Sequence, residues 1–306
     1  MKKIVKNKKL IWLLVILVVT VVSSFLGLND YENYFDFPST SNAESADIQA
    51  DKIEVHYIDV GQGDCSLIIC NGKTMLIDAG ENGNETKVLD YLRMCNIKKL
   101  DYIIASHQHT DHIGGLPEVI DEIGAENIIM PRLTEKQTPT NKTYTAFLKA
   151  IQNSDAKVIA AKVGEVYSLG DAQFEILAPI MNDTDNLNNM SVVVKLKFGE
   201  RTFLFTGDAE KTAEIDILAS GADVDCDVLK VGHHGSGTSS CVEFLEAVTP
   251  KICVIQVGAD NSYGHPHKNI IERLKNYSDK IYRNDICGDI VIESDGTTLN
   301  VKYENQ

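Results

Sequence analysis

The 306-residue sequence predicts an α/β protein built as an αββα sandwich, in which two sheets pack face to face and helices cover their outer faces. From Ile53 onwards, apolar runs typical of strands alternate with helical patterns, and this alternation is found in both halves of the region. Seven of the eight histidines lie just after predicted apolar strands. Strand-rich halves with interleaved helices favour two packed sheets with helices outside.

The elements of the first half follow from periodicity and turn residues. Apolar runs bounded by Gly, Asn and Asp predict strands at 52–60, 65–70, 74–80, 100–106 and 127–130. Residues 84–97 have the helical spacing of Val88, Leu89, Leu92 and Ile97, and further helices are predicted at 114–124 and 141–154. The stretch 156–179 reads as two or three strands separated by Gly turns.

The second half begins with a predicted hairpin at 191–210 that ends on Gly207 and Asp208. Strands are then predicted at 226–232, 251–258, 288–294 and 297–303, and helices at 211–220, 241–248 and 267–276. The seven cysteines are an odd number, are scattered, and form no C-x-x-C pair. They are expected to be small buried apolar residues rather than a disulfide framework.

The N-terminus predicts a membrane segment. Five lysines precede an uncharged run at residues 10–28, which as a helix is about 28 Å long, close to the hydrocarbon thickness of a bilayer. We expect a cytoplasmic basic tail at 1–9, a transmembrane anchor or signal sequence at 10–28, a flexible linker at 29–51 and a catalytic domain at 52–306. An anchor gives a single-pass membrane protein with its catalytic domain outside the cell, and a cleaved signal gives a secreted protein.

Net charge limits the classes of partner. The whole chain carries −15, and the part after residue 28 has 24 basic and 44 acidic residues, a net charge of −20. A body this acidic lacks the positive footprint of proteins that bind nucleic acid without sequence preference, although a local basic groove is still compatible with it. No segment gives a strong signal for a protein partner.

The stretch SHQHTDHIGG at 106–115 predicts a metal site. His107 and His109 are two residues apart, so in an extended backbone they project to the same side and can hold one ion. Asp111 and His112 follow, and a turn into the next helix would direct them to a second ion, as in two-metal hydrolytic sites. Ser106 could orient a ligand ring by a hydrogen bond. Gly114 and Gly115 would let the backbone bend sharply beside the site.

Three further segments add candidates. Asp208 follows a predicted strand and could bridge two ions, although an aspartate there is also a common helix N-cap. His233 and His234 also follow a strand, and one of them could complete the second site. His265 is a candidate ligand or proton donor to the leaving group, whereas His267 is expected at the surface and His56 in the core.

Six stretches resemble the metallo-β-lactamase fold superfamily, and more narrowly the catalytic domain of ComEC-type competence proteins. They are IDVGQGDCSLI, MLIDAG, SHQHTDHIGG, NNMSVVVKLKFGERTFLFTGDAE, VLKVGHHGS and NSYGHPH, in order between about 53 and 295. The resemblance implies that His107 and His109 bind metal one, that Asp111 and His112 bind metal two with one of His233 and His234, and that Asp208 bridges both. Asp59, Asp64 and Asp78 would be turn residues and residues that orient ligands.

One departure from the superfamily concerns metal one. Many members supply another histidine from the region before the bridging aspartate, whereas here that region reads DNLNNMSVVV, with Asn188 and Asn189. Metal one could therefore be weakly held, completed by water, or selective for a harder ion such as Mn²⁺. Two divalent ions, Zn²⁺ first and Mn²⁺ second, are the expected cofactors.

The expected reaction is hydrolysis by a metal-bound hydroxide, with Asp111, Asp208 and His265 as catalytic residues. The ComEC resemblance favours a phosphodiesterase or nuclease acting on a small-molecule or nucleic-acid phosphodiester. An esterase, lactonase, lactam hydrolase or phosphorylcholine-esterase-like enzyme on the same site is the alternative, and a β-lactamase proper is disfavoured by the absent histidine. A non-hydrolytic metal or redox protein and an anchored binding module without activity are the remaining alternatives.

Overall fold

The computed structural model describes residues 52–180 and 184–305. The predicted anchor at 10–28 and the predicted linker lie outside these residues. Within the described ranges, no helix is both long enough and apolar enough to span a bilayer.

The described residues form two sheets. The first has eight strands in the order β15-β14-β1-β2-β3-β4-β5-β6, and the second has seven in the order β13-β12-β11-β10-β9-β8-β7. The strands of the first sheet are β1 (Ile53–Tyr57), β2 (Ser66–Cys70), β3 (Lys73–Ile77), β4 (Leu100–Ile104), β5 (Ala125–Met130), β6 (Lys157–Ala160), β14 (Ile290–Ser294) and β15 (Asn300–Tyr303). Those of the second are β7 (Val166–Leu169), β8 (Ala172–Ala178), β9 (Val193–Phe198), β10 (Arg201–Phe205), β11 (Val228–Lys230), β12 (Ile252–Ile255) and β13 (Lys280–Arg283).

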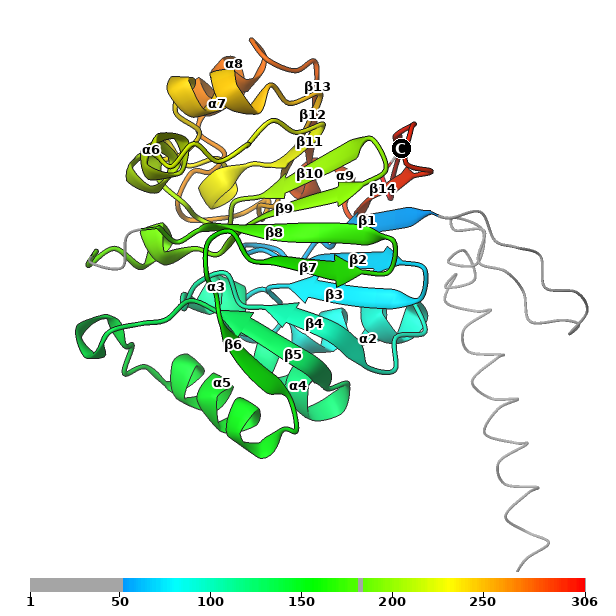
Figure 1. Ribbon diagram of the computed structural model, residues 1–306, viewed down its shortest axis with the longest axis vertical. Helices are drawn as coiled ribbons and strands as arrows, with labels where there is room; N and C mark the ends of the chain where they lie inside the picture. The colour runs from blue at the N-terminus through cyan, green and yellow to red at the C-terminus, as the bar shows by residue number, and fades with distance from the viewer. Residues whose placement is uncertain (1–51, 181–183, 306) are drawn as a thin grey trace, which may run out of the picture. The chain divides into compact units, whose positions relative to one another are not determined.

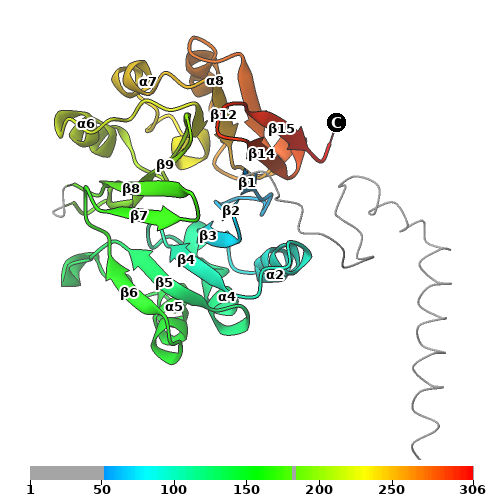
Figure 2. The same cartoon turned by 45° about the vertical axis from the view of Figure 1, so that its right-hand side comes forward.

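Helices cover the outer face of each sheet (Figures 1 and 2). The first sheet carries α2 (Glu85–Met94), α4 (Leu116–Glu122) and α5 (Lys142–Asn153), and the second carries α6 (Lys211–Ala219), α7 (Val242–Val248) and α8 (Lys268–Leu274). The short helices are α3 (Thr110–Ile113), α9 (Asn284–Cys287) and the 3₁₀ turns η2 (Glu135–Gln137), η3 (Leu187–Met190) and η4 (Gly232–Gly235). The predicted αββα sandwich is confirmed.

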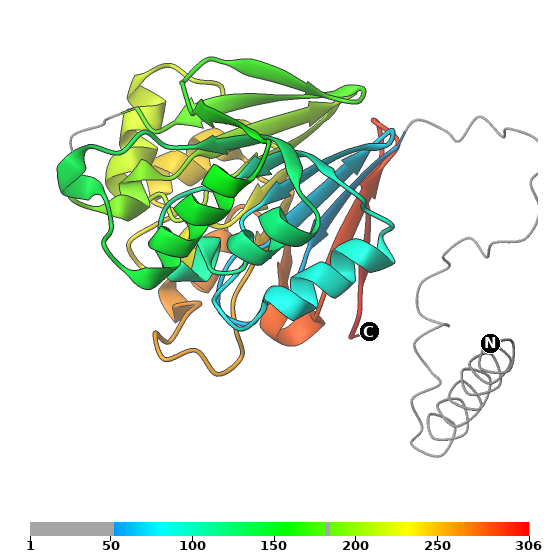
Figure 3. The same cartoon turned by 90° about the horizontal axis from the view of Figure 1, so that it is seen from below.

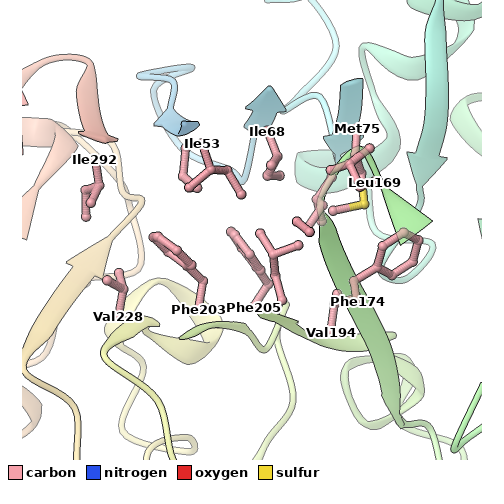
Figure 4. Close-up of a cluster of buried hydrophobic side chains, with 14 of the residues drawn as sticks. Ile53, Ile68, Met75, Leu169, Phe174, Val194, Phe203, Phe205, Val228 and Ile292 are labelled. Atoms are coloured by element: carbon pink, nitrogen blue, oxygen red, sulfur yellow. The ribbon is translucent and has the colours of Figure 1, made fainter. Parts of the chain in front are cut away.

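Alternation along the strands explains the layers. Phe203 and Phe205 of β10 point between the sheets, whereas Leu204 between them packs under the helices of the second sheet. Figure 4 shows Phe203 and Phe205 directed toward residues of the opposite sheet such as Ile68. Full burial of each such side chain contributes about 1.5–3 kcal/mol, so this layer makes a large contribution to the stability of the fold.

Parallel strand pairs determine where loops meet. β3, β4, β5 and β6 are paired in parallel in the first sheet, as are β10, β11, β12 and β13 in the second. Parallel neighbours need a crossover, and here α2, α4, α5, α6, α7 and α8 provide these crossovers. The carboxyl ends of the strands in each parallel group therefore lie at one edge, where ligand sites of α/β sheets are found. Figure 3 views the two sheets and their helices from a third direction.

Three elements of the structure, besides the 3₁₀ turns η2, η3 and η4, were absent from the sequence-based expectations. They are β13, α9 and α3, of which the last contains Asp111 and His112. All three have only four residues, and the burial pattern of β13 is neither apolar nor alternating. Their formation depends on neighbours, since β13 pairs in parallel with β12.

Candidate metal centre

The predicted metal ligands lie in loops that follow β4, β10 and β11 at the carboxyl edges of the two sheets. The loop after β4 contains His107 and His109 and leads into α3 with Asp111 and His112, and Asp208 follows β10 by three residues. β10 and β11 are parallel neighbours, so their following loops emerge side by side. The backbone N–H of His233 donates to the carbonyl of Gly207 at 3.1 Å, which fixes the loop after β11 against the loop that carries Asp208.

One carboxylate oxygen of Asp208 is the common point of the cluster. Its side chain is 2% exposed. Four imidazole nitrogens face Oδ2 of Asp208: Nε2 of His112 at 3.3 Å, of His234 at 3.5 Å, of His233 at 3.6 Å and of His107 at 3.9 Å. Segments separated by more than a hundred residues therefore converge on one carboxylate.

The donor set fits a divalent cation. One donor atom each from Asp111, His112, Asp208 and His234 can be chosen so that all four lie within 4.8 Å of one another. Nε2 of His112, Nε2 of His234 and Oδ1 of Asp208 are buried and make no hydrogen bond to any described residue. Buried polar groups are normally hydrogen-bonded or bound to a metal, and this set of imidazoles and carboxylates suits a metal such as zinc, iron or manganese.

The other histidine pair lies beside this group. Nε2 of His107 and Nδ1 of His109 are 3.0 Å apart, and the ring centroids are separated by 4.7 Å. Two nitrogens at this separation can both bond one ion at about 2.0–2.1 Å. His107 is fully buried and His109 is partly open to the cavity described below.

The tandem histidines differ in their placement. His234 belongs to the four-donor group, whereas His233 is more exposed and hydrogen-bonds through Nδ1 to the Thr238 hydroxyl at 3.1 Å. Both have left-handed backbone conformations, with φ of 50° and 53°. Such conformations cost on the order of 1–3 kcal/mol each for residues other than glycine, and they cluster at functional sites.

Hydrogen bonds fix the ligand rings. Nδ1 of His112 donates to Oδ2 of Asp78 at 2.8 Å, and the Ser106 hydroxyl donates to the same oxygen at 2.5 Å. Nδ1 of His234 donates to the backbone carbonyl of Gln256 at 2.9 Å. With Nδ1 as the donor, each ring turns the lone pair of Nε2 toward Asp208, which is the usual way that a metal-bound histidine is oriented.

Lys230 is a functional candidate that sequence reasoning missed. It ends β11, is 1% exposed, and its ammonium group pairs with Asp64 and donates to the Gly207 carbonyl at 3.1 Å. Asp64 in turn lies 3.2 Å from Nδ1 of His234. Asp64, Asp78 and His112 also have donor atoms close together, but Lys230 supplies the positive charge there. The sequence feature that could have identified it is a lysine within the apolar run VLKV, where a charged side chain is unusual.

Charges within the cluster shift its pKa values. Burial by itself would lower the pKa of His112 and His234, but the nearby carboxylates, first Asp208, raise both well above the ordinary value. Burial opposes ionisation of Asp208, yet His112 and His234 hold its pKa well below the usual range. The carboxylates thus stabilise positive charge on these rings, and a divalent ion supplies that charge in place of protons.

A cavity of about 720 Å³ opens onto the cluster. His109, Asp111, Asp208, His233 and His234 all line it, as does His265. The His265 ring centroid is 5.5 Å from that of His233. Burial, followed by the neighbouring histidines 233 and 234, lowers the pKa of His265 to about 4, so the ring is neutral at pH 7.

Asn188 and Asn189 belong to η3, in the stretch before Asp208 where the resemblance led us to look for a further histidine. Nδ2 of Asn188 donates to Glu210 at 3.1 Å, and Oδ1 of Asn188 is buried without a described hydrogen-bond partner. Asn188 lines the cavity. Oδ1 of Asn189 instead accepts the backbone N–H of Glu210 at 3.1 Å. Glu210, rather than Asp208, is the N-cap residue of α6, so capping does not explain Asp208.

The expectation that Gly114 and Gly115 permit a sharp bend was wrong. Their φ values of −60° and −87° are ones that any residue adopts. A Cβ on Gly114 would approach the carbonyl carbon of Glu81 to 2.6 Å, and one on Gly115 would approach the Ala79 oxygen to 2.5 Å. These glycines are needed because the chain after β3 passes directly over them.

The remaining sequence-based expectations concern isolated residues. His56 is buried, and its Nδ1 is 2.9 Å from the Tyr91 hydroxyl, as expected for a core histidine. His267 is half-buried and accepts the backbone N–H of Gly237 at 2.8 Å. No disulfide links the cysteines of the described residues, and six of the seven are buried, as expected for small apolar residues.

Residues 58–258 match the Metallo-beta-lactamase superfamily, and this range contains every candidate ligand in the cluster. The chain belongs to the metallo-beta-lactamase superfamily. As a member, it is a metal-dependent hydrolase of this fold.

Curated relatives of this superfamily chain include three bacterial proteins. ComE operon protein 3 of Bacillus subtilis is 30% identical over 83% of the chain, Recombination protein 2 of Haemophilus influenzae 31% over 78%, and Competence protein ComA of Neisseria gonorrhoeae 27% over 75%. The chain spans about a third or less of the length of each, at 33%, 28% and 30%. The resemblance to competence proteins is thus confirmed for the part of them that this chain matches.

A solved structure has the same fold. The metallo-beta-lactamase fold protein YhfI from Bacillus subtilis aligns with a TM-score of 0.51 at 17% identity, over 80% of this chain and 100% of YhfI. At this level of identity the likeness concerns the fold and carries no information about the substrate.

Proposed function

We propose that the chain is an exported, membrane-anchored phosphodiesterase that cleaves phosphodiester bonds at a two-metal centre. The observation that carries this proposal is the convergence of four imidazoles on Oδ2 of Asp208, with Asp111 3.3 Å from His234. The names of two relatives refer to competence and recombination, and recombination is a process whose substrate is DNA. These names favour a phosphodiester over other ester bonds.

In this proposal, His107 and His109 would hold one ion, Asp111, His112 and His234 would hold the other, and Asp208 would be available to both. His233 lies at the edge of the cluster and contacts the substrate or the first ion. Bound ions of this kind lower the pKa of water to about 7 and stabilise charge on the phosphate. Asp78 and the Gln256 carbonyl keep Nδ1 of His112 and His234 protonated, so that their Nε2 lone pairs face the ions.

His265 is assigned a role in binding. It lines the cavity, and its Nδ1 is buried and makes no hydrogen bond to a described residue. An N–H of a neutral imidazole can donate a hydrogen bond to a phosphate oxygen or to the leaving oxygen. This use needs no charge on the ring.

An esterase or lactonase acting at the same site is the second candidate. Among the described residues that line the cavity, none is lysine or arginine, and Glu81 and Asp260 add carboxylates. A cavity without basic side chains suits substrates of low charge. A single phosphodiester, with one negative charge, is compatible with it, and so is a neutral ester.

The test is a panel of substrates given to purified full-length protein with Zn²⁺ or Mn²⁺. The panel contains bis-p-nitrophenyl phosphate, single-stranded DNA, a lactone and nitrocefin. We expect cleavage of the two phosphodiesters, loss of this cleavage in EDTA, and a fall in kcat of at least about a thousandfold for Asp208→Asn or Asp111→Ala, since charge stabilisation is lost.

The matched control is Asp121→Asn, the same kind of change at an exposed position of α4. It should retain the activity of the unaltered protein. Cleavage of the lactone with inert phosphodiesters would replace the proposal by the esterase alternative. Full activity of purified Asp208→Asn would refute the assignment of the centre.

A further inference from the structure

The loop between β12 and α8 forms one wall of the cavity above the metal centre. Asp260, Asn261, Ser262, Tyr263 and His265 of this loop line it. The loop follows the carboxyl end of a parallel strand next to β11, so it lies beside the ligands that follow β11. The histidine pair and the four-donor group come from the segments after β4, β10 and β11. The side chains of the loop after β12 can therefore contact a substrate.

The side chain of Asn261 holds the central part of this loop in shape. Nδ2 of Asn261 donates to the carbonyls of Gly258 at 2.8 Å and His265 at 2.7 Å. Oδ1 of Asn261 accepts the backbone N–H of His265 at 3.0 Å and of Tyr263 at 3.2 Å. Four hydrogen bonds from one amide fix the backbone on both sides of Tyr263. The tyrosine ring is thus presented by a loop that is ordered before any substrate binds.

Tyr263 is the most exposed of the large apolar side chains among the described residues, at 64%. Its ring lies nearly parallel to that of His265, with centroids 5.6 Å apart and an interplanar angle of 21°. The His265 ring is in turn 6.4 Å from that of His234, at 27°. A series of roughly parallel rings therefore leads from solvent at Tyr263 to a residue of the four-donor group.

The charge of the cavity limits how a nucleic acid can be held there. Its described lining carries carboxylates at Glu81 and Asp260 in addition to those of the metal centre, and no lysine or arginine. Proteins that grip a nucleic acid by its backbone use basic side chains against successive phosphates. Aromatic stacking is the other common source of affinity for unpaired nucleotides, and it needs no basic residue.

We infer that Tyr263 is a stacking platform for an unpaired nucleobase next to the phosphodiester that is cleaved, so that the site takes short single-stranded oligonucleotides. This inference rests on the proposed phosphodiesterase function. A base in a duplex already stacks on its neighbours and has no free face, which excludes intact double strands from the platform. The acidic side chains around the cavity also repel the many negatively charged phosphates of a long duplex.

The experiment compares two substrates that share a leaving group. Thymidine 5′-(p-nitrophenyl phosphate) carries a base, and methyl p-nitrophenyl phosphate does not. In full-length Tyr263→Ala, KM for the thymidine ester should rise roughly 5- to 150-fold, the range expected from loss of one stacked base, while kcat changes less than about threefold. Kinetics with the methyl ester should be unchanged. Tyr263→Phe, which keeps the ring, should match the unaltered protein with both substrates.

A binding measurement separates this inference from the proposed function. Fluorescence anisotropy of a labelled tetrathymidylate, titrated with full-length protein in EDTA, reports stacking without hydrolysis. Weaker binding in Tyr263→Ala, retained in Tyr263→Phe, supports the platform even if neither ester is cleaved, in which case only the phosphodiesterase proposal fails. Equal losses on both esters would show a structural role, and unaltered KM and anisotropy in Tyr263→Ala would overturn the inference.

Discussion

At the scale of single residues, the buried pair of Asp64 and Lys230 contacts two of the segments that carry candidate metal ligands. Asp64 is in the loop between β1 and β2, and Lys230 ends β11, so the two come from different sheets. Both are almost fully buried. Lys230 also donates to the Gly207 carbonyl, directly before Asp208, and Asp64 faces His234. The pair therefore joins the backbone of one ligand loop to the ring of another.

We predict that Lys230→Met lowers the free energy of unfolding by about 3–5 kcal/mol, because it leaves the Asp64 carboxylate buried without its cation. Asp64→Asn added to that variant should recover a large part of the loss, since the buried charge is then removed. The measurement is a double-mutant cycle by denaturant unfolding of full-length protein in EDTA, which keeps metal binding out of the comparison.

The interaction energy from this double-mutant cycle tests whether Lys230 and Asp64 act as a pair. If the effects of Lys230→Met and Asp64→Asn simply add, the two side chains do not depend on one another and the pair has no joint role. Lys251→Met is a suitable control, because Lys251 has a largely exposed side chain that pairs with Asp227 and should cost about 1 kcal/mol or less.

The same pair shows which residues the sequence could and could not predict. His107, His109, Asp111 and His112 were predictable because their spacing is local and their residue types are uncommon together. Asp64 was predicted only as a turn or orienting residue, and Lys230 was missed. The two residues lie 166 positions apart in the chain, and no local pattern reports a contact between a loop of one sheet and a strand of the other.

At the scale of elements, strands and helices with strong periodicity were predicted well. α2 and α5 begin and end within the predicted ranges, because their apolar residues repeat at helical spacing and Asn141 caps α5 by accepting the Tyr144 N–H at 2.8 Å. The turn at 233–235 was not predictable. There His233, His234 and Gly235 all adopt left-handed backbone, and two of the three are not glycine.

The N-terminal segment is the element whose role is proposed from sequence alone. We predict that full-length protein sediments with membranes and that deletion of residues 1–28 releases it, because the uncharged run at 10–28 is long enough to cross a bilayer. Deletion of 29–51 should leave the protein in the membrane fraction and serves as the control. Fractionation followed by immunoblotting measures this.

Two results would change that interpretation. Full-length protein found only in the soluble fraction with an intact N-terminus would contradict the anchor. A mature N-terminus after residue 28, identified by mass spectrometry in the culture medium, would instead select the cleaved signal sequence.

At the scale of the whole molecule, the metal centre joins the two halves of the sandwich. Asp111 and His112 follow a strand of the first sheet, whereas Asp208 and His234 follow strands of the second. Elsewhere the sheets meet largely through apolar side chains such as those in Figure 4, with polar links such as Lys230 to Asp64 and Ser66 to Gln256. A cation held by ligands from both sheets therefore stabilises their association as well as the local loops.

This arrangement predicts a metal-dependent melting temperature. A ligand that binds only the folded state adds about 2.7 kcal/mol at a concentration 100 times its Kd, which for a domain of this size corresponds to a rise in Tm of about 5–10 °C. We expect this rise, growing with the logarithm of Zn²⁺ or Mn²⁺ concentration, when full-length protein freed of metal by EDTA is titrated and followed by calorimetry. Asp208→Asn should lose most of the rise, because an amide is a weaker metal ligand than a carboxylate, whereas Asp121→Asn should retain it. An equal rise in Asp208→Asn would mean that the stabilising ion binds elsewhere, and the two sheets would then be held together without the centre.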